Sequence, residues 1–322
     1  MKKELSYLDK IKVLSDTKET FEKELEKRLK IIKVGSPLFV KTSSGLQDGL
    51  TGVEKAVGFD KSEERFEIVH SLAKWKREAL GKYAFPLHTG LYTDMKAIRK
   101  DEEVDAIHSL YVEQWDWEKV IDKSDRTVEY LKETVSSIYE SLIKTIKKMK
   151  KKYAFIDLEL PSKLFFITSQ ELEDLYPEYS PKKREELITK EKKAVFIIGI
   201  GEKLKSGIPH DLRSPDYDDW SLDGDLLVYD KALDREIEIS SMGIRVDEKT
   251  LLEQLEKTDT LDRTGLSYHQ KILMKELPYT IGGGIGQSRV LMLILGATHI
   301  AEVQASSWEE KTLEETKDLK IL

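Results

Sequence analysis

The stretch YTIGGGIGQSRVLMLIL, residues 279–295, decides how the rest of the chain is interpreted. Its glycine-rich part, residues 282–286, is followed by Arg289 and by an apolar run over residues 290–295. Glycine lacks a Cβ, so the backbone there can adopt positive φ angles and let a ligand come close. The apolar run is too short to span a bilayer and predicts a buried helix. We therefore expect Arg289 at the start of a buried helix beside a permissive backbone, which suits a nucleotide.

The same stretch also fits a tight turn between a strand and a core helix. Its spacing matches neither the dinucleotide fingerprint nor the phosphate-binding P-loop, because no Lys-Ser or Lys-Thr pair follows the glycines. Arg289 favours a binding site, since an unpaired charge inside an apolar block is costly.

The length and composition of the chain limit the classes of protein to which it can belong. The 322 residues allow one large domain or two smaller ones, and 39% hydrophobic with 35% charged residues indicates a globular chain. A formal net charge of −7 argues against a nucleic-acid-binding surface. Cysteine is absent, which excludes disulfides, thiolate metal sites and a cysteine nucleophile. The start, MKKELSYLDK, lacks the apolar segment of a signal peptide, so we expect a cytoplasmic protein and no membrane partner.

The N-terminal part predicts a long helix that leads into strands. Residues 15–30 begin with the cap-like Ser15 and Asp16, and strand patterns follow within residues 31–40. The apolar positions that recur every four residues are Phe21, Leu25 and Leu29. A second helical stripe runs over residues 122–152 and indicates a core or an interface rather than a cofactor site.

Strand patterns occupy much of the remaining chain. Residues 109–117 alternate, residues 194–200 predict a buried strand, and residues 225–229 and 235–246 predict an antiparallel pair. Helical patterns fall between them without regular alternation, among them residues 251–255 and 266–277. This mixture predicts an α+β fold with a mainly antiparallel sheet flanked by helices.

One polar constellation lies in HDLRSPDYDDW, residues 210–220, which we expect to be irregular because of Pro215 and the turn formers around it. Loops on a rigid scaffold are where binding groups gather. The same composition equally fits an acidic surface turn. Its charged residues are Asp211, Arg213, Asp216, Asp218 and Asp219.

Other polar groups fall on predicted strands. Alternation places Glu236, Glu238 and Ser240 on one face, and Glu238 with Asp225 offers hard oxygen ligands for Mg²⁺ with phosphates completing the shell. An ordinary exposed strand face is the alternative. Gln114 and Asp116 share a face with apolar residues, so they need partners, and a ligand is one candidate.

Two further observations concern cations and histidines. Arg99 follows a predicted strand and can bind phosphate as a bidentate fork. The six histidines show no metal-ligand spacing, and we interpret them as structural.

Several motifs together resemble a known family. The segments LEKRLKIIKVGSPLFV, GLYTDMKAIR with HSLYVEQWDWE, and GGGIGQSR resemble the three motifs of class II aminoacyl-tRNA synthetase catalytic domains. The segments TSSGLQDGLTGVEKAV, FEIVHSLAKWKR, HDLRSPDYDDW, DGDLLVYD and EISSMGIRVD narrow the likeness to ammonia-dependent asparagine synthetases, the A-type aspartate–ammonia ligases. The likeness covers nearly the whole chain, in order. It implies a single catalytic domain over residues 1–322 with a helical insertion around residues 122–163.

The resemblance implies a reaction and its participants. ATP adenylates the side-chain carboxylate of L-aspartate, giving β-aspartyl-AMP and pyrophosphate, and ammonia then releases asparagine and AMP. Arg99 resembles the second-motif arginine that grips the α-phosphate. Arg289 resembles the third-motif arginine, near either the adenine or the γ-phosphate. The remaining residues expected at the nucleotide are Arg213, Asp225, Glu238, Ser240, Gly284 and Gly286.

The resemblance also implies an amino-acid subsite and a metal. Mg²⁺ is expected on Glu238 and Asp225 together with ATP. Asp218 is expected to act in catalysis, and Asp48 is our hypothesis for the base that deprotonates ammonium. The residues expected around aspartate are Ser71, Lys76, Gln114, Asp116, Asp218, Ser241 and Arg245.

Two rival functions stay open at this stage. An aspartyl- or asparaginyl-tRNA synthetase core shares adenylation, but it needs an anticodon domain and a basic tRNA face, and this acidic chain starts with the first motif. A catalytically inactive, synthetase-like regulator is disfavoured because Arg99, Arg289, Asp225 and Glu238 are all present.

Two expectations concern assembly and the nitrogen source. The first motif, within residues 24–40, predicts a homodimer because its helix has an apolar face to bury. Free ammonia is the expected nitrogen donor, since the chain has no cysteine and no segment left over for a glutaminase domain.

Overall fold

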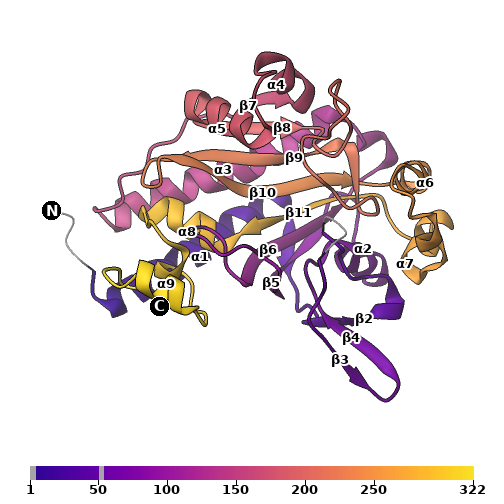
Figure 1. The fold of residues 1–322 in the computed structure, drawn as a ribbon, viewed down its shortest axis with the longest axis horizontal. Helices are drawn as coiled ribbons and strands as arrows, with labels where there is room; N and C mark the ends of the chain where they lie inside the picture. Colours follow the sequence, from indigo (N-terminus) through magenta and orange to yellow (C-terminus); the bar gives the residue numbers. More distant parts are fainter. Residues whose placement is uncertain (1–4, 51–53) are drawn as a thin grey trace.

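The computed structural model describes residues 5–50 and 54–322, and its centre is one large, mainly antiparallel sheet (Figure 1). Within the described residues the sheet has eight strands in the order β1-β5-β6-β11-β10-β9-β8-β7. The strands are β1 (Ile31–Lys33), β5 (Gly90–Ile98), β6 (Tyr111–Val120), β7 (Phe165–Thr168), β8 (Ala194–Ile198), β9 (Asp218–Asp230), β10 (Arg235–Arg245) and β11 (Thr280–Gly286). Only the edge strands β1 and β7 pair in parallel among these, which confirms the predicted sheet type.

Helices cover this sheet, and a small second sheet projects from it (Figure 1). The projecting sheet has the order β2-β4-β3 and consists of β2 (Phe39–Lys41), β3 (Gly58–Lys61) and β4 (Glu64–Ile68). The helices are α1 (Tyr7–Leu29), α2 (Ala73–Lys82), α3 (Val128–Lys152), α4 (Ser169–Leu175), α5 (Pro181–Lys192), α6 (Glu248–Lys257), α7 (Ser267–Leu273), α8 (Gln287–Leu295) and α9 (Glu310–Glu315).

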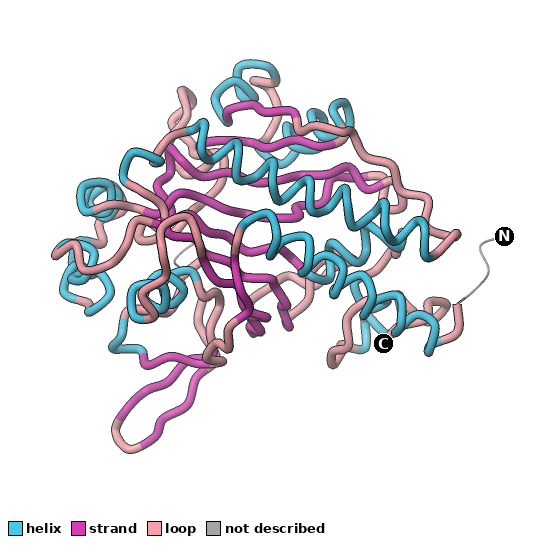
Figure 2. The backbone as a smooth tube through the Cα atoms, turned by 180° about the vertical axis from the view of Figure 1, so that it is seen from behind, coloured by secondary structure: helices cyan, strands magenta, loops and turns pink. Residues whose placement is uncertain are grey.

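The main hydrophobic core lies between one face of the sheet and the helices α1, α3 and α8, of which α1 and α3 run side by side (Figure 2). Trp115 and Trp117 of β6 and Met242 of β10 point into this core and are fully buried. Because side chains alternate along a strand, the intervening residues of β6 and β10 face the opposite side of the sheet. That opposite side carries the candidate site.

Helix α1 begins earlier than predicted. The expected start at Ser15 is wrong, because Ser6 caps the helix by accepting a hydrogen bond from the Asp9 amide at 3.1 Å. Val13 and Leu14 are buried and continue the apolar face upstream of Phe21. A helix of this length buries more apolar area than the predicted segment, and its own cap satisfies the first turn.

Helix α3 lies within residues 122–163, the region predicted as a helical insertion. Its stripe, from Leu131 to Met149, is buried in the same core as α1 and the sheet. This helix therefore contributes to the main core and does not form a separate appendage. This agrees with the prediction that the stripe packs rather than binds a cofactor.

Strand β11 corrects our interpretation of the glycine-rich stretch. Its glycines form an extended strand, and the positive φ angles expected there are absent from Gly282 to Gly286 in this part of the described chain. A Cβ at Gly282 would overlap the Glu118 carboxylate, and one at Gly284 would overlap the Gln114 amide. The glycines therefore make room for side chains of β6 to cross the strand. The predicted buried helix is confirmed as α8, which starts directly after the strand.

The described residues contain no helix that combines the length and the apolar character needed to cross a membrane.

Candidate active site

A cavity of about 370 Å³ opens on the face of the sheet opposite α1 and α3. Strands β6, β9, β10 and β11 form its floor, while α2, the segment around Asp48 and the loop before β9 form its walls. The structure brings most of the predicted site residues to its lining. They are Asp48, Ser71, Lys76, Arg99, Gln114, Asp116, Arg213, Asp218, Glu238, Ser241, Arg245, Gly284, Gly286 and Arg289.

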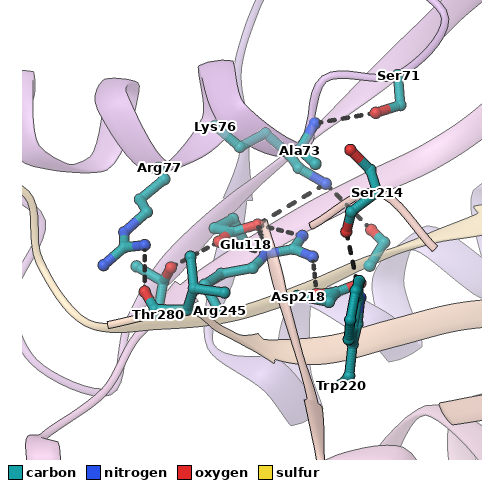
Figure 3. A network of polar contacts seen from close by, with 12 residues as sticks. Ser71, Ala73, Lys76, Arg77, Glu118, Ser214, Asp218, Trp220, Arg245 and Thr280 are labelled. Atoms are coloured by element: carbon teal, nitrogen blue, oxygen red, sulfur yellow. Dashed lines mark hydrogen bonds and ion pairs between the residues drawn. The ribbon is translucent and has the colours of Figure 1, made fainter. Parts of the chain in front are cut away.

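One end of the cavity is a buried network of acids and bases, shown in Figure 3. Lys76 is fully buried, forms an ion pair with Asp116 and donates to the Gly283 carbonyl at 3.2 Å. Asp116 in turn accepts from the Leu72 amide at 3.1 Å, at the N-terminus of α2, where a negative charge is favourable. Burial lowers the pKa of Lys76, although the charges of Asp116 and Glu118 oppose this effect.

Arg245 occupies the centre of this network. Its Nε and Nη2 atoms donate to the two Glu118 oxygens at 2.9 and 2.7 Å, and its Nη1 forms an ion pair with Asp218. Asp218 is the direct strand partner of Arg245 across β9 and β10. Burial raises the pKa of Asp218, and Arg245 opposes that rise. Burial alone would raise the pKa of Glu118, but Arg245, Lys76 and the Thr280 hydroxyl together outweigh it and hold that pKa below its usual value.

Glu118 is a further site residue that the predicted strand did not include. It is fully buried, accepts from the Thr280 hydroxyl at 2.7 Å and lies 3.9 Å from the Lys76 ammonium. The signal was present, because the alternation that pairs Gln114 with Asp116 reaches Glu118 two residues later. The predicted strand ended one residue too early to include it.

Asp48 faces the cavity from the opposite wall. Its carboxylate accepts from the Ser71 hydroxyl at 2.6 Å and from the Leu50 amide at 2.8 Å, and it is 2% exposed. The His70 ring contacts the Asp48 carbonyl at 3.1 Å. Three carboxylates, on Asp48, Asp116 and Asp218, therefore line this end of the cavity together with the two cations Lys76 and Arg245. A fourth carboxylate, on Glu118, is buried against both cations. Such a surplus of acid attracts a cationic group.

The other end of the cavity gathers three guanidinium groups. Arg99 donates to the His70 carbonyl at 3.3 Å, and Arg289 lies 3.6 Å from the Glu238 carboxylate. Arg213 pairs with Asp225 at 2.5 Å. The buried Nε atoms of Arg99 and Arg213 have no hydrogen-bond partner within the described residues. Unsatisfied guanidinium donors suit phosphate oxygens.

The predicted magnesium ligands lie at this arginine-rich end. Glu238 lines the cavity, as predicted. Asp225 was also expected to face the nucleotide, but it pairs with Arg213 and does not line the cavity. The Asp225 Oδ1 atom is buried without a partner among the described residues. Burial, with the nearby Glu238 charge, raises the pKa of Asp225 to about 7 against the opposing charge of Arg213. An orphaned carboxylate oxygen of this kind fits a metal supplied with phosphate.

The described residues contain no cluster of three or more His, Asp or Glu side chains that could hold a metal by themselves. A divalent ion at Glu238 and Asp225 would therefore need phosphate oxygens to complete its shell.

The prediction that Ser240 shares a face with Glu238 is wrong. The pairing of β9 with β10 shifts register between these two residues, which marks a β-bulge. As a result the Ser240 hydroxyl donates to the Gly284 carbonyl at 2.9 Å and does not line the cavity. Ser241 takes the place on the cavity side instead. Strict alternation could not anticipate a bulge.

The loop before β9 is shorter than predicted. Residues 218–220, expected to be irregular, belong to β9, because Asp218 pairs with Arg245 there. The buried Asp216, in the irregular part, accepts from Lys74 and contacts the His269 ring outside the cavity. His210 contacts Glu185 at 3.0 Å in the same buried manner, which agrees with a structural interpretation of these two histidines. His108, by contrast, lines the cavity.

Comparison of the fold with solved structures first identifies a structural class. Asparaginyl-tRNA synthetase from Pyrococcus horikoshii, solved with asparaginyl-adenylate, superposes with a TM-score of 0.65 at 15% identity, over 92% of this chain and 68% of that chain. Aspartyl-tRNA synthetase from Entamoeba histolytica superposes with a TM-score of 0.59 at 17% identity, over 92% of this chain and 57% of that chain. The fold is that of a class II aminoacyl-tRNA synthetase catalytic domain.

Sequence comparison then gives the family. The model of the aspartate–ammonia ligase family matches residues 8–320. The chain is 56% identical over 300 residues to a ligase of that name from Clostridium perfringens, covering 92% of this chain and 89% of the relative. It is 52% identical over 311 residues to one from Lactobacillus johnsonii, covering 95% of this chain and 93% of the relative. The chain belongs to the aspartate–ammonia ligase family.

Proposed function

We propose that this chain uses ATP to make L-asparagine from L-aspartate and ammonia through a β-aspartyl-AMP intermediate. The observation that carries the proposal is the division of one cavity into a carboxylate-rich end and an arginine-rich end, in a chain of this family. An amino acid needs the first kind of end and a nucleoside triphosphate needs the second.

Aspartate binds at the carboxylate-rich end. The surplus of acid around Asp116 and Asp218 favours its α-ammonium group. Lys76 and Arg245 offer positive charge to its two carboxylates, while Gln114, Ser71 and Ser241 add neutral hydrogen-bonding groups. Both cations are already held by protein carboxylates, so binding requires little reorganisation of the site.

Adenylation takes place where the two ends meet. An oxygen of the aspartate side-chain carboxylate forms a bond to the α-phosphorus of ATP, and the bond from that phosphorus to pyrophosphate breaks. Negative charge builds up on the phosphate oxygens during this step. Arg99 and Arg289, which both line the cavity at its arginine-rich end, stabilise it with donors that are fixed in advance.

Mg²⁺ accompanies ATP in this proposal, and Glu238 with Asp225 would hold it. The partnerless Oδ1 atom of Asp225 supports the assignment. When bound, the metal supplies positive charge that offsets the charge of the phosphates.

Amidation follows at the Asp48 wall. Ammonium enters a site with surplus negative charge, and Asp48 accepts its proton, which frees the nitrogen lone pair. Nitrogen then bonds to the acyl carbon, the bond from that carbon to AMP breaks, and the remaining surplus proton leaves to solvent. The absence of cysteine supports free ammonia as the donor, because amide-splitting domains commonly use a cysteine nucleophile.

The homodimer, the cytoplasmic location, the single domain over residues 1–322 and the absence of nucleic acid among the partners stay predictions. Exposed apolar side chains in the first-motif region, such as Ile32 at 59% and Leu38 at 49%, support a subunit interface there. Sedimentation at micromolar concentration would detect a dimer.

The decisive experiment supplies ATP, Mg²⁺, aspartate and ammonium, and quantifies AMP and asparagine together. We expect equal amounts of the two products. AMP release that depends on tRNA, with retention of labelled tRNA, would favour the synthetase alternative. Failure to release pyrophosphate from ATP and aspartate would favour an inactive regulator. Glutamine free of ammonia should support little asparagine formation.

A further inference from the structure

A second buried charge cluster lies outside the cavity and is centred on Asp216. The Asp216 Oδ2 atom accepts from Lys74 Nζ at 2.7 Å and from Arg263 Nη1 at 3.2 Å, and it contacts His269 Nε2 at 3.0 Å. Its Oδ1 atom accepts from the Ser214 hydroxyl at 2.8 Å. Lys74, Asp216 and His269 are at most 3% exposed, and none of them lines the cavity.

Such a cluster is a poor device for stability alone. Removing two charges from water costs several kcal/mol per ion, and well-packed apolar side chains often serve a fold better. We therefore consider which segments the cluster joins. Asp216 belongs to the loop that carries Arg213 and leads into Asp218, which lie at the two ends of the cavity.

Lys74 joins this loop to the wall on which Asp48 lies. Its ammonium donates to the Gln47 carbonyl at 3.1 Å as well as to Asp216 at 2.7 Å. The Gln47 carbonyl belongs to the peptide bond whose nitrogen is that of Asp48, so this contact acts on the backbone that orients the Asp48 side chain. Lys74 also lies in the first turn of α2, two residues before Lys76.

We propose that Lys74 is a positioning residue for amidation, which holds the Gln47–Asp48 peptide in register with the loop that carries Arg213 and Asp218. The acyl-adenylate forms between that loop and the sheet, and Asp48 must meet it from the opposite wall. Because Lys74 contacts both the Gln47 carbonyl and Asp216, it fixes the position of the Asp48 segment relative to the loop before β9. This inference rests on the proposed function, in which Asp48 accepts the proton of ammonium.

Other contacts keep the two segments folded when Lys74 is altered. The Gln47 side chain donates to the Ile68 carbonyl at 2.9 Å and accepts from the His70 amide at 3.0 Å. Asp216 retains Arg263, His269 and Ser214. Loss of the Lys74 bridge should therefore loosen the position of Asp48 without removing the arginines that act in adenylation.

The experiment compares Lys74→Met with the matched control Arg263→Met, which also removes one cation from Asp216 but does not reach Gln47. Two activities are measured on each: aspartate-dependent exchange of pyrophosphate into ATP, and asparagine formation against ammonium concentration. For Lys74→Met we expect exchange within about twofold of the parent protein, and asparagine formation reduced about tenfold with a raised KM for ammonium. Arg263→Met should leave both activities within about twofold.

An equal fall of both activities in Lys74→Met, or an equal selective fall in Arg263→Met, would overturn the proposal. If Lys74→Met does not fold, Lys74→Gln places a shorter polar side chain at position 74 and leaves Asp216 its contacts with Arg263, His269 and Ser214. That variant should show the same selective loss, and unaltered amidation in it would count equally against Lys74. Absence of asparagine formation in the parent protein would instead refute the proposed function, so the two failures are distinguishable.

Discussion

The two ends of the cavity differ in how completely their charges are satisfied. At the carboxylate-rich end, Lys76 and Arg245 each have protein partners, and Glu118 accepts from both Arg245 and Thr280. At the arginine-rich end, the Nε atoms of Arg99 and Arg213 and one oxygen of Asp225 are buried without partners in the described part of the chain. The first end is a closed network before any substrate binds, and the second has unused hydrogen-bonding groups.

This difference indicates a division of labour. A closed network holds its members in one arrangement and can reject a substrate that fails to match it, because a displaced partner leaves a buried charge unpaired. Groups without partners contribute little to the fold, but they gain most when a phosphate arrives. Substitutions at the closed end should therefore affect stability and substrate choice, whereas those at the open end should affect rate.

The largest effect is expected from Glu118→Gln, which would break the closed network. It removes the Glu118 charge from Arg245 and Lys76 and leaves them only Asp218 and Asp116, respectively, as buried counter-charges. Breaking a buried ion pair costs about 3–5 kcal/mol in the free energy of unfolding. Urea denaturation measures this loss. The control is Glu113→Gln on the same strand, whose pairing with Lys18 at 3.4 Å is partly exposed and contributes about 1 kcal/mol or less. Equal losses in the two variants would contradict the comparison.

The sequence predicts one of these ends better than the other. Arg289 stands out because it adjoins an apolar block, where a charge requires a partner. Arg99 stands out because it follows a predicted strand, and Arg213 because it lies in a charged loop. All three line the cavity. Glu118 does not stand out, since its partners Arg245 and Thr280 come from strands distant in sequence. A local sequence pattern shows which residue types lie near one another along the chain. It does not show a closed network, because such a network depends on how distant strands pair.

The fold shows the same limit. The antiparallel sheet, the α1 stripe and helix α8 follow from periodicity, which is a local property. The bulge at Ser240 and the extended glycines of β11 do not, because both depend on neighbouring strands. Strict alternation and the permissive backbone of glycine therefore led to the wrong face in one case and the wrong conformation in the other.

The variants Arg99→Ala and Arg289→Ala test the arginine-rich end, where we expect an effect on rate. Each should lose about 3 kcal/mol of transition-state stabilisation, which is about a hundredfold in pyrophosphate exchange. Their free energies of unfolding should change by less than that of Glu118→Gln, because neither arginine belongs to the closed network. Arg235→Ala, at an ion pair with Glu236 away from the cavity, serves as the control and should retain normal exchange. Normal exchange in either cavity variant would remove that arginine from the proposed mechanism.

The titration of Asp225 provides a further test at the arginine-rich end of the cavity. A pKa of about 7 means that its carboxyl is largely protonated at pH 6 and largely ionised at pH 8. Binding of Mg²⁺ with a non-hydrolysable ATP analogue favours the ionised form. It should therefore release more of a proton from this group at pH 6 than at pH 8. Asp225→Asn removes this contribution, so the difference in proton release between the two proteins isolates it. A difference that does not fall with rising pH would contradict the assignment, as would full activity in EDTA.

The smallest effect is expected from Ser240→Ala. The bulge turns this hydroxyl toward the Gly284 carbonyl, so the variant loses one buried hydrogen bond, about 1 kcal/mol, and keeps its activity within about twofold. Ser241→Ala, one residue along on the cavity side, should raise the KM for aspartate more. A larger kinetic defect in Ser240→Ala than in Ser241→Ala would mean that the strand follows simple alternation in solution.

The glycines of β11 also limit how this site can be redesigned. A stretch of the cavity floor is bare main chain, and any side chain introduced at Gly282 or Gly284 meets Glu118 or Gln114 before it meets a substrate. Mutagenesis for a longer or shorter dicarboxylic acid therefore has little to gain on this strand. Libraries should vary other lining side chains, at Gln114, Ser241 and Ser71, and leave the glycines as a fixed surface.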